Sequence, residues 1–186
     1  MLTRGDELER DSLFIVAELM CLAARTSPKG VGVDNIVTGV VSGSTKDMLV
    51  SEMRSIDKEL QNLRVFGINA DMVSISELVV LIGTRFKRLM IPTCNFCGFK
   101  DCEASSKAGA ICVFNIGDLG IAIGSALSVA GRHHADNRVM FTIGKAALNL
   151  KLLGDDVKIV YGIPLSAKGK NPYFDIGWRK AFGAAS

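Results

Sequence analysis

Four cysteines that lie close together constrain this chain more than any other sequence feature. Cys94, Cys97, Cys102 and Cys112 follow the spacing Cys-x2-Cys-x4-Cys-x9-Cys, within a segment that we place at residues 91–114. A secreted disulfide scaffold would spread its cysteines through a short chain, and this chain does not. The four thiols are therefore predicted to be a set of metal ligands.

A [4Fe-4S] cluster is the first interpretation of these thiols. It needs four thiolates around one small volume, and two cysteines separated by two residues can wrap one corner of it. Gly98, directly after Cys97, can adopt backbone angles that other residues avoid and bring N–H groups toward the sulfurs. Three aromatic rings are candidates for keeping water away: Phe96, Phe99 and Phe114. The segment contains no histidine, which argues against a Rieske-type centre.

Two alternatives stay open. A structural zinc ion takes the same four thiolates, although such sites usually use two short Cys-x2-4-Cys pairs and only Cys94 and Cys97 form one here. In the other alternative the four thiols bind nothing. The fifth cysteine, Cys21, lies on the apolar side of a predicted helix, where we expect a small buried hydrophobe and not a ligand.

The composition is that of a globular protein. Of the 186 residues, 48% are hydrophobic and 22% are charged, which excludes intrinsic disorder, and a net charge of +3 gives no reason to expect a nucleic-acid partner. The charged N-terminus does not resemble a secretory signal peptide. Residues 111–131 are the most apolar stretch, but Asp118 and several glycines favour a buried helix over a membrane span. We expect a cytoplasmic protein that does not enter a membrane.

Helical and strand patterns alternate along the chain. Helices are predicted over 6–25, 44–63, 118–131 and 138–153, and strands over 36–41, 78–83 and 157–163. In the first helix we expect one apolar face, made by Leu8, Ile15, Leu19 and Leu22, to point toward the core. The pattern predicts a single α/β or α+β domain over 1–186, of three-layer type, with helices packed on a mixed sheet and the cysteine segment inserted into it.

Small residues recur every three or four positions along the third predicted helix. They are Gly117, Gly120, Gly124, Ser128 and Gly131. A stripe with almost no side chains lets another backbone or a flat ligand approach closely. We favour close helix packing as its role.

Several stretches outside the cysteine motif carry a family resemblance. They are GDLGIA at 117–122, DNRVM at 136–140, GIPLSAKGKNPYFD at 162–175, and AART with PKG between 23 and 30. Together with the cysteines, they resemble the bacterial and archaeal family of ferredoxin domain-containing proteins of unknown function. The resemblance covers nearly the whole chain. It implies an iron-sulfur cluster on Cys94, Cys97, Cys102 and Cys112, and it leaves the mechanism open.

A second resemblance is to the nitroreductase-like flavoproteins, and it implies a nitroreductase-like fold. It consists of a basic turn after the first helix, Asp118-Leu119-Gly120, a strand that ends in Gly162-Ile163-Pro164, and a basic C-terminal segment. The residues that it implies for binding the phosphate of FMN are Arg25, Ser27, Lys29, Gly30, Lys168 and Lys170.

The other polar groups are expected to be structural. His133, His134 and Asp136 are metal-binding side-chain types, but neighbouring side chains on a loop generally point apart, so we predict a polar turn. Asp136 and Arg138 are expected to form an ion pair.

Two functions remain. In the first, the chain is a one-cluster electron-transfer protein with an unidentified redox partner, and its body is a docking or oligomerisation scaffold, a homodimer being one candidate assembly. In the second, it is a flavin-dependent oxidoreductase that uses the cluster as an electron relay.

Overall fold

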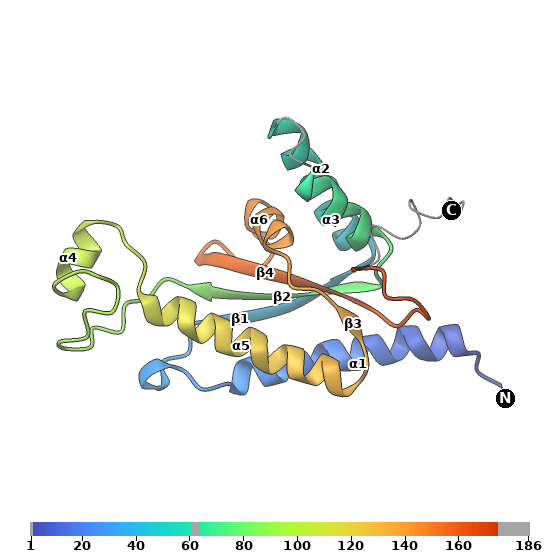
Figure 1. Cartoon of the computed structure of the whole chain (residues 1–186), viewed down its shortest axis with the longest axis horizontal. Coiled ribbons are helices and arrows are strands. Elements are labelled where there is room, and N and C mark those ends of the chain that lie inside the picture. The colour runs from blue at the N-terminus through green and yellow to red at the C-terminus, as the bar shows by residue number, and fades with distance from the viewer. Residues whose placement is uncertain (1, 61–63, 175–186) are drawn as a thin grey trace.

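A four-stranded sheet lies between two layers of helices (Figure 1). The computed structural model describes residues 2–60 and 64–174. One face of the sheet is covered by α1 (Gly5–Thr26) and α5 (Val113–Arg132), and the other by α2 (Gly43–Glu59), α3 (Val65–Ser74) and α6 (Phe141–Asn149). The three-layer α/β class expected from the sequence is confirmed.

The sheet is antiparallel throughout the described strands, where a mixed sheet was expected. Its order is β1 (Ile36–Ser42), β2 (Leu78–Arg85), β4 (Val157–Ser166) and β3 (Asp136–Asn137). Two helices, α2 and α3, connect β1 to β2 and return the chain to the end of the sheet where β1 stops. Ser42 therefore pairs with Leu78, and β2 runs back along β1.

Strand β2 forms the centre of the core. Leu78, Val80 and Ile82 pack in the layer with α1 and α5, whereas Val79 and Leu81 pack in the layer with α2, α3 and α6. All five are fully buried. Helices cover both faces, and this explains why the strand reads as a continuous apolar run instead of an alternating one.

The face by which α1 packs is not the one that the sequence predicts. The residues expected to face the core are exposed: Leu8, Ile15, Leu19 and Leu22. A neighbouring face is buried instead, made by Leu13, Val16, Ala17, Met20 and Ala24. Alanines on α1 and α5 let the two helices approach closely, so the buried face is the one with the smaller side chains.

Helix boundaries differ from the prediction where other contacts compete. The described part of α2 ends at Glu59, and residues 61–63 of the predicted helix lie outside the described residues. Helix α6 is shorter than predicted because residues 136–137 pair with β4 and Met140 bridges to Gly162. Helix α3 was not predicted, and α5 begins five residues before the predicted start at 118.

The small-residue stripe of α5 does not pack against another described segment. A Cβ built on Gly117, Gly120, Gly124 or Gly131 would have no atom within 4 Å outside its own helix. The close helix packing expected there is found instead between α6 and β4, where a Cβ on Gly144 would lie 1.6 Å from the carbonyl oxygen of Val160.

Helix α5 is the one described helix long and apolar enough to cross a membrane. In this fold it packs along α1 and the sheet, and it buries Leu119, Ala122 and Ala126. Asp118 is buried with them and accepts a hydrogen bond from the backbone N–H of Gly30 at 2.9 Å. The buried carboxylate therefore has a partner inside the protein.

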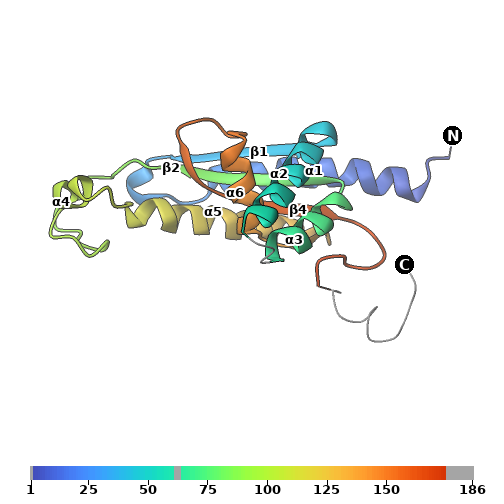
Figure 2. The same ribbon diagram turned by 90° about the horizontal axis from the view of Figure 1, so that it is seen from above.

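The cysteine segment forms an arm at one end of the molecule. It leaves β2, includes the short helix α4 (Cys102–Lys107), and returns to the start of α5. Figures 1 and 2 show α4 beyond the end of the sheet in two perpendicular views. The cysteine-rich segment is thus inserted between a strand and a helix of the fold, as the sequence predicts.

Candidate iron-sulfur site

The arm is fixed to the body at its base by side chain to backbone hydrogen bonds. The Asn115 side chain, which is fully buried at the start of α5, accepts from the N–H of Lys87 and donates to the carbonyl of Lys87, both at 3.1 Å. On the arm itself, Asp101 caps α4 by accepting from the N–H of Ala104 at 2.7 Å. These bonds hold the strand exit and the two helix starts that carry the cysteines.

The four cysteines of the arm line one cavity of about 350 Å³. Cys94 and Cys97 come from the loop after β2, Cys102 is the first residue of α4, and Cys112 precedes the first residue of α5. All four thiols are half-buried and unpaired by disulfides. The fold of the arm thereby brings Cys94 and Cys112, which are 18 positions apart in the sequence, to the same cavity.

Left-handed backbone is concentrated around this cavity. Gly98 has φ +81°, as expected from the sequence, and Met90, Thr93 and Asn95 have φ of 54°, 59° and 48°. Such angles cost free energy for residues other than glycine and persist where their surroundings hold them. The left-handed residues therefore indicate that the surrounding structure holds the loop in one conformation.

The aromatic residues do not all shield the cavity. Phe99 lines it, but Phe96 is 77% exposed and stacks on Phe114, with ring centroids 6.2 Å apart. Phe114 lies directly over Gly30, where a Cβ would be 2.8 Å from the ring. Phe114 therefore connects the arm to the turn after α1.

Four thiols around one cavity fit the donor set of an iron-sulfur cluster. Among the described residues, no three Cys, His, Asp or Glu side chains lie close enough to hold one metal ion. Thiolates around zinc all lie about 2.3 Å from the same atom and so crowd together. In a cubane each thiolate binds a different iron, and four thiols around a larger cavity match that requirement.

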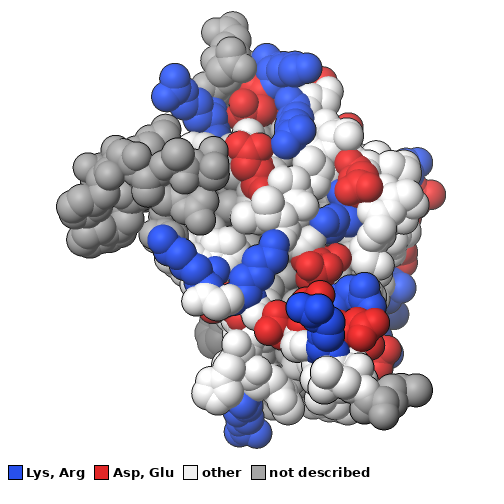
Figure 3. All heavy atoms as spheres, turned by 90° about the vertical axis from the view of Figure 1, so that its right-hand side faces the viewer, with Lys and Arg blue, Asp and Glu red and all other residues white. Residues whose placement is uncertain are grey.

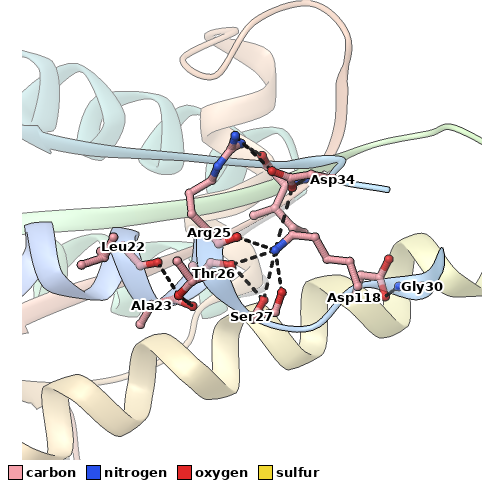
Figure 4. Close-up of polar contacts among 11 residues, drawn as sticks. Leu22, Ala23, Arg25, Thr26, Ser27, Gly30, Asp34 and Asp118 are labelled. Carbon is pink, nitrogen blue, oxygen red and sulfur yellow. Dashed lines mark hydrogen bonds and ion pairs between the residues drawn. The ribbon is translucent and has the colours of Figure 1, made fainter. Parts of the chain in front are cut away.

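The turn after α1, predicted to bind phosphate, is closed by its own hydrogen bonds (Figure 4). The ammonium group of Lys29 donates to the carbonyls of Arg25 at 2.6 Å and Ser27 at 2.8 Å, and its side chain is 6% exposed. These carbonyls lie at the C-terminus of α1, where helical partners are missing. Arg25 donates to the carbonyl of Ile36 and pairs with Asp34 at 3.0 Å. The two cations therefore hold the turn together.

Lys168 lies at the opposite end of the sheet from this turn. Its ammonium group donates to the carbonyl of Ile75 at 2.8 Å, next to the start of β2. Arg25 donates to the carbonyl of Ile36 at the start of β1, whereas the start of β2 pairs with the end of β1. The length of β1, about 20 Å, therefore separates Arg25 from Lys168. Figure 3 shows this end of the molecule, with Lys and Arg interspersed with Asp and Glu. Within one chain the described structure does not bring Arg25, Ser27, Lys29 and Gly30 together with Lys168 and Lys170.

The remaining sequence candidates lie apart from the arm. His133 ends α5 and His134 has a left-handed backbone, which agrees with the predicted polar turn. Asp136 accepts from Asn171 at 2.8 Å, and Arg138 donates to the carbonyl of Tyr173 at 3.0 Å, in place of the expected pair between them.

Cys21 packs against the core around α1, away from the cysteine cavity. Burial raises the pKa of its thiol and so disfavours the thiolate that a metal would need.

Arg88 and Ser105 are among the residues of the cavity lining that sequence reasoning missed. Arg88 donates to the carbonyls of Ser105 at 3.2 Å and Ala110 at 2.7 Å. An arginine and a serine beside a cysteine motif are common surface residues, and only the fold of the arm shows that Ser105 is buried and Arg88 half-buried there.

The fold and the cysteine cavity together define a class: a nitroreductase-type fold that carries a cysteine-rich arm. Among solved structures, the chain is similar to NfrA2 of Bacillus megaterium, with 14% identity, TM-score 0.55, and coverage of 84% of this chain and 58% of that chain. It is similar to the FMN-dependent nitroreductase NfnB of Mycobacterium smegmatis in complex with NADPH, with 11% identity, TM-score 0.59, and coverage of 84% and 78%. The chain thus spans little more than half the length of NfrA2.

The sequence comparisons give the family. An uncharacterized protein of Archaeoglobus fulgidus is 35% identical over 187 residues, which cover 94% of this chain and 97% of the relative. The family model described as "Uncharacterized protein containing a ferredoxin domain (DUF2148)" matches residues 108–176, from the end of the arm through β4. The chain belongs to this family of ferredoxin domain-containing proteins.

Proposed function

We propose that the chain binds one [4Fe-4S] cluster and transfers electrons through it. The observation that carries the proposal is the convergence of Cys94, Cys97, Cys102 and Cys112 on a single cavity. The ferredoxin domain in the family's description supports an iron-sulfur redox role. When bound, the cluster would accept and release one electron at a time.

The chain's own residues would hold the cluster and exclude water from it. The four thiolates supply the ligands, and the cap that Asp101 places on α4 fixes the position of Cys102. Phe99 and the aliphatic side chains of Ile91 and Val113 line the cavity beside them. An apolar lining lowers the local dielectric and so influences the potential of the site. A redox partner is part of the proposal, because each electron must come from another molecule and leave to another.

Metal analysis of anaerobically purified variants tests the ligand set. Cys97→Ser should lose iron and inorganic sulfide together, since a serine oxygen is a poor ligand for iron in a sulfur cluster. Cys21→Ala is the matched control and should keep both, because Cys21 lies outside the cavity. Stoichiometric zinc without sulfide in the unaltered protein would instead establish a structural zinc site.

A flavin-dependent oxidoreductase is the second candidate. It is favoured by the fold, because one similar structure is an FMN-dependent nitroreductase. In this candidate the turn after α1 and the Lys168 region would bind FMN, and the cluster would pass electrons to it. Since β1 separates the two groups by about 20 Å, a flavin phosphate cannot touch both within one chain. A site that used both would need a second copy of the chain.

A further inference from the structure

Two buried hydrogen-bond donors beside the cysteines have no partner in the described part of the chain. Four buried side-chain atoms there lack a partner, and two of these are Nε of Arg88 and Oγ of Ser105. Both residues line the same cavity as the four cysteines. Buried polar atoms are nearly always paired, because water no longer compensates for a missing bond. Two unpaired donors at one cavity therefore point to an acceptor inside it.

Arg88 cannot turn away to find another partner. One of its terminal nitrogens donates to the carbonyls of Ser105 and Ala110, which fixes the guanidinium against the C-terminal end of α4. Its neighbour Lys87 is held by both of its backbone groups to Asn115. The Nε–H of Arg88 is buried and has no partner in the described part of the chain. A guanidinium also keeps its charge at any working pH.

Arg88 is the only lysine or arginine among the described residues that line the cavity. The two carboxylates of the lining are occupied elsewhere: Asp101 caps α4, and Glu103 pairs with Lys107 at 2.7 Å. Ser105 is 2% exposed and lies three residues after Cys102 on α4, close to one turn of helix away. The other hydroxyl of the lining, on Thr93, donates to the carbonyl of Pro92. The described lining thus offers one fixed positive charge and one unpaired hydroxyl to whatever the thiolates hold.

We propose that Arg88 and Ser105 are positioning residues that donate hydrogen bonds to the sulfur atoms of the cluster and its thiolates, and that they raise the reduction potential of the site. The inference rests on the proposed function. Sulfur atoms of such a cluster carry negative charge and accept hydrogen bonds, and reduction adds one more negative charge. Donors and a cation therefore favour the reduced form, and the potential becomes less negative.

Ser105→Ala tests the proposal with the smallest change. It removes a hydroxyl that has no partner in the described chain, so the cluster-free protein should keep its melting temperature. In the cluster-loaded full chain, the midpoint potential should shift to a more negative value, and a chelator should remove iron faster. The matched control is Ser106→Ala on the same helix, at an exposed position outside the cavity lining, which should change neither quantity.

Arg88 variants add the test of charge. Arg88→Gln should shift the potential further than Ser105→Ala, and Arg88→Lys should recover part of the shift because it keeps the charge but not the planar fork. Exchange into deuterium oxide should move the iron-sulfur stretching bands in the resonance Raman spectrum of the unaltered protein more than in Ser105→Ala.

The outcomes separate this inference from the function on which it rests. Unaltered protein that carries no cluster would contradict the proposed function itself. A loaded cluster whose potential, iron release and Raman bands are the same in Ser105→Ala as in the unaltered protein would overturn the roles of the two donors. The latter result would mean that water or nothing pairs with them. The Ser105→Ala comparison decides the matter even if Arg88→Gln does not fold.

Discussion

Gly144 provides a severe test of the packing described here, because α6 lies directly on the backbone of β4. A Cβ at this position would be 1.6 Å from the carbonyl oxygen of Val160, whereas ordinary contacts begin at 3.4 Å. In Gly144→Ala, α6 must therefore move outward by about 2 Å or distort. That movement would open space beneath Ile143 and Ala146, which are fully buried.

The expected loss of stability combines two opposing terms. Overpacking of this kind costs about 1–3 kcal/mol, and the helix itself gains up to about 1 kcal/mol when alanine replaces glycine. Because the obstacle is backbone and cannot rotate away, we expect the upper end of the cost and a net loss of about 2 kcal/mol. For a chain of this size, that corresponds to a decrease in Tm of about 4–8 °C.

Thermal unfolding followed by circular dichroism measures the effect, with samples of equal cluster content. The matched control is Gly124→Ala on α5, where the new Cβ meets open space. Its Tm should stay the same or rise, since only the gain in helix propensity applies. Equal melting temperatures for the two variants would refute the contact between α6 and β4.

Three further predictions concern other parts of the molecule. Burial raises the pKa of Tyr173, so the contribution of its phenol group to stability is complete below the unfolded pKa of about 10 and is lost at higher pH. In urea unfolding, Tyr173→Phe should lose about 1 kcal/mol of stability at neutral pH, and its stability should depend less on pH above 10. A Tyr173→Phe variant that still lost stability at alkaline pH would contradict this prediction. We propose that the chain forms a homodimer through the exposed apolar face of α1. Light scattering should show a dimer, and Ile15→Glu should convert it to a monomer. Unaltered protein that is monomeric would contradict the proposal. If FMN binds, an FMN concentration of 100 times its Kd should add about 2.7 kcal/mol to the free energy of unfolding. Replacing Lys168 and Lys170 by alanine should abolish this gain. An unchanged melting temperature with FMN would leave electron transfer as the function.

Elements with a strong and simple pattern could be predicted from the sequence. The run from Leu78 to Ile82 indicated a strand buried on both faces, and helices do cover both faces of β2. The four cysteines were expected to lie together because they are near one another in the chain and share one chemistry, and all four line one cavity; their role as metal ligands stays a prediction.

Features that depend on distant contacts could not be predicted in this way. The largest apolar side chains of α1, such as Ile15 and Leu22, are exposed, while Ala17 and Ala24 are buried, because close helix packing selects small residues. Lys29 has the residue type of a phosphate ligand, but its ammonium group caps the end of α1. The sequence alone does not show which backbone carbonyls lack a hydrogen-bond partner, because this depends on how the chain folds.

Native mass spectrometry of anaerobically purified protein tests the central claim most directly. The account predicts that the folded chain carries the added mass of four irons and four sulfides, and that this mass is lost as a unit in Cys97→Ser and kept in Cys21→Ala. A folded chain that carries a single zinc ion, or no added mass after anaerobic purification and reconstitution with iron and sulfide, would contradict it.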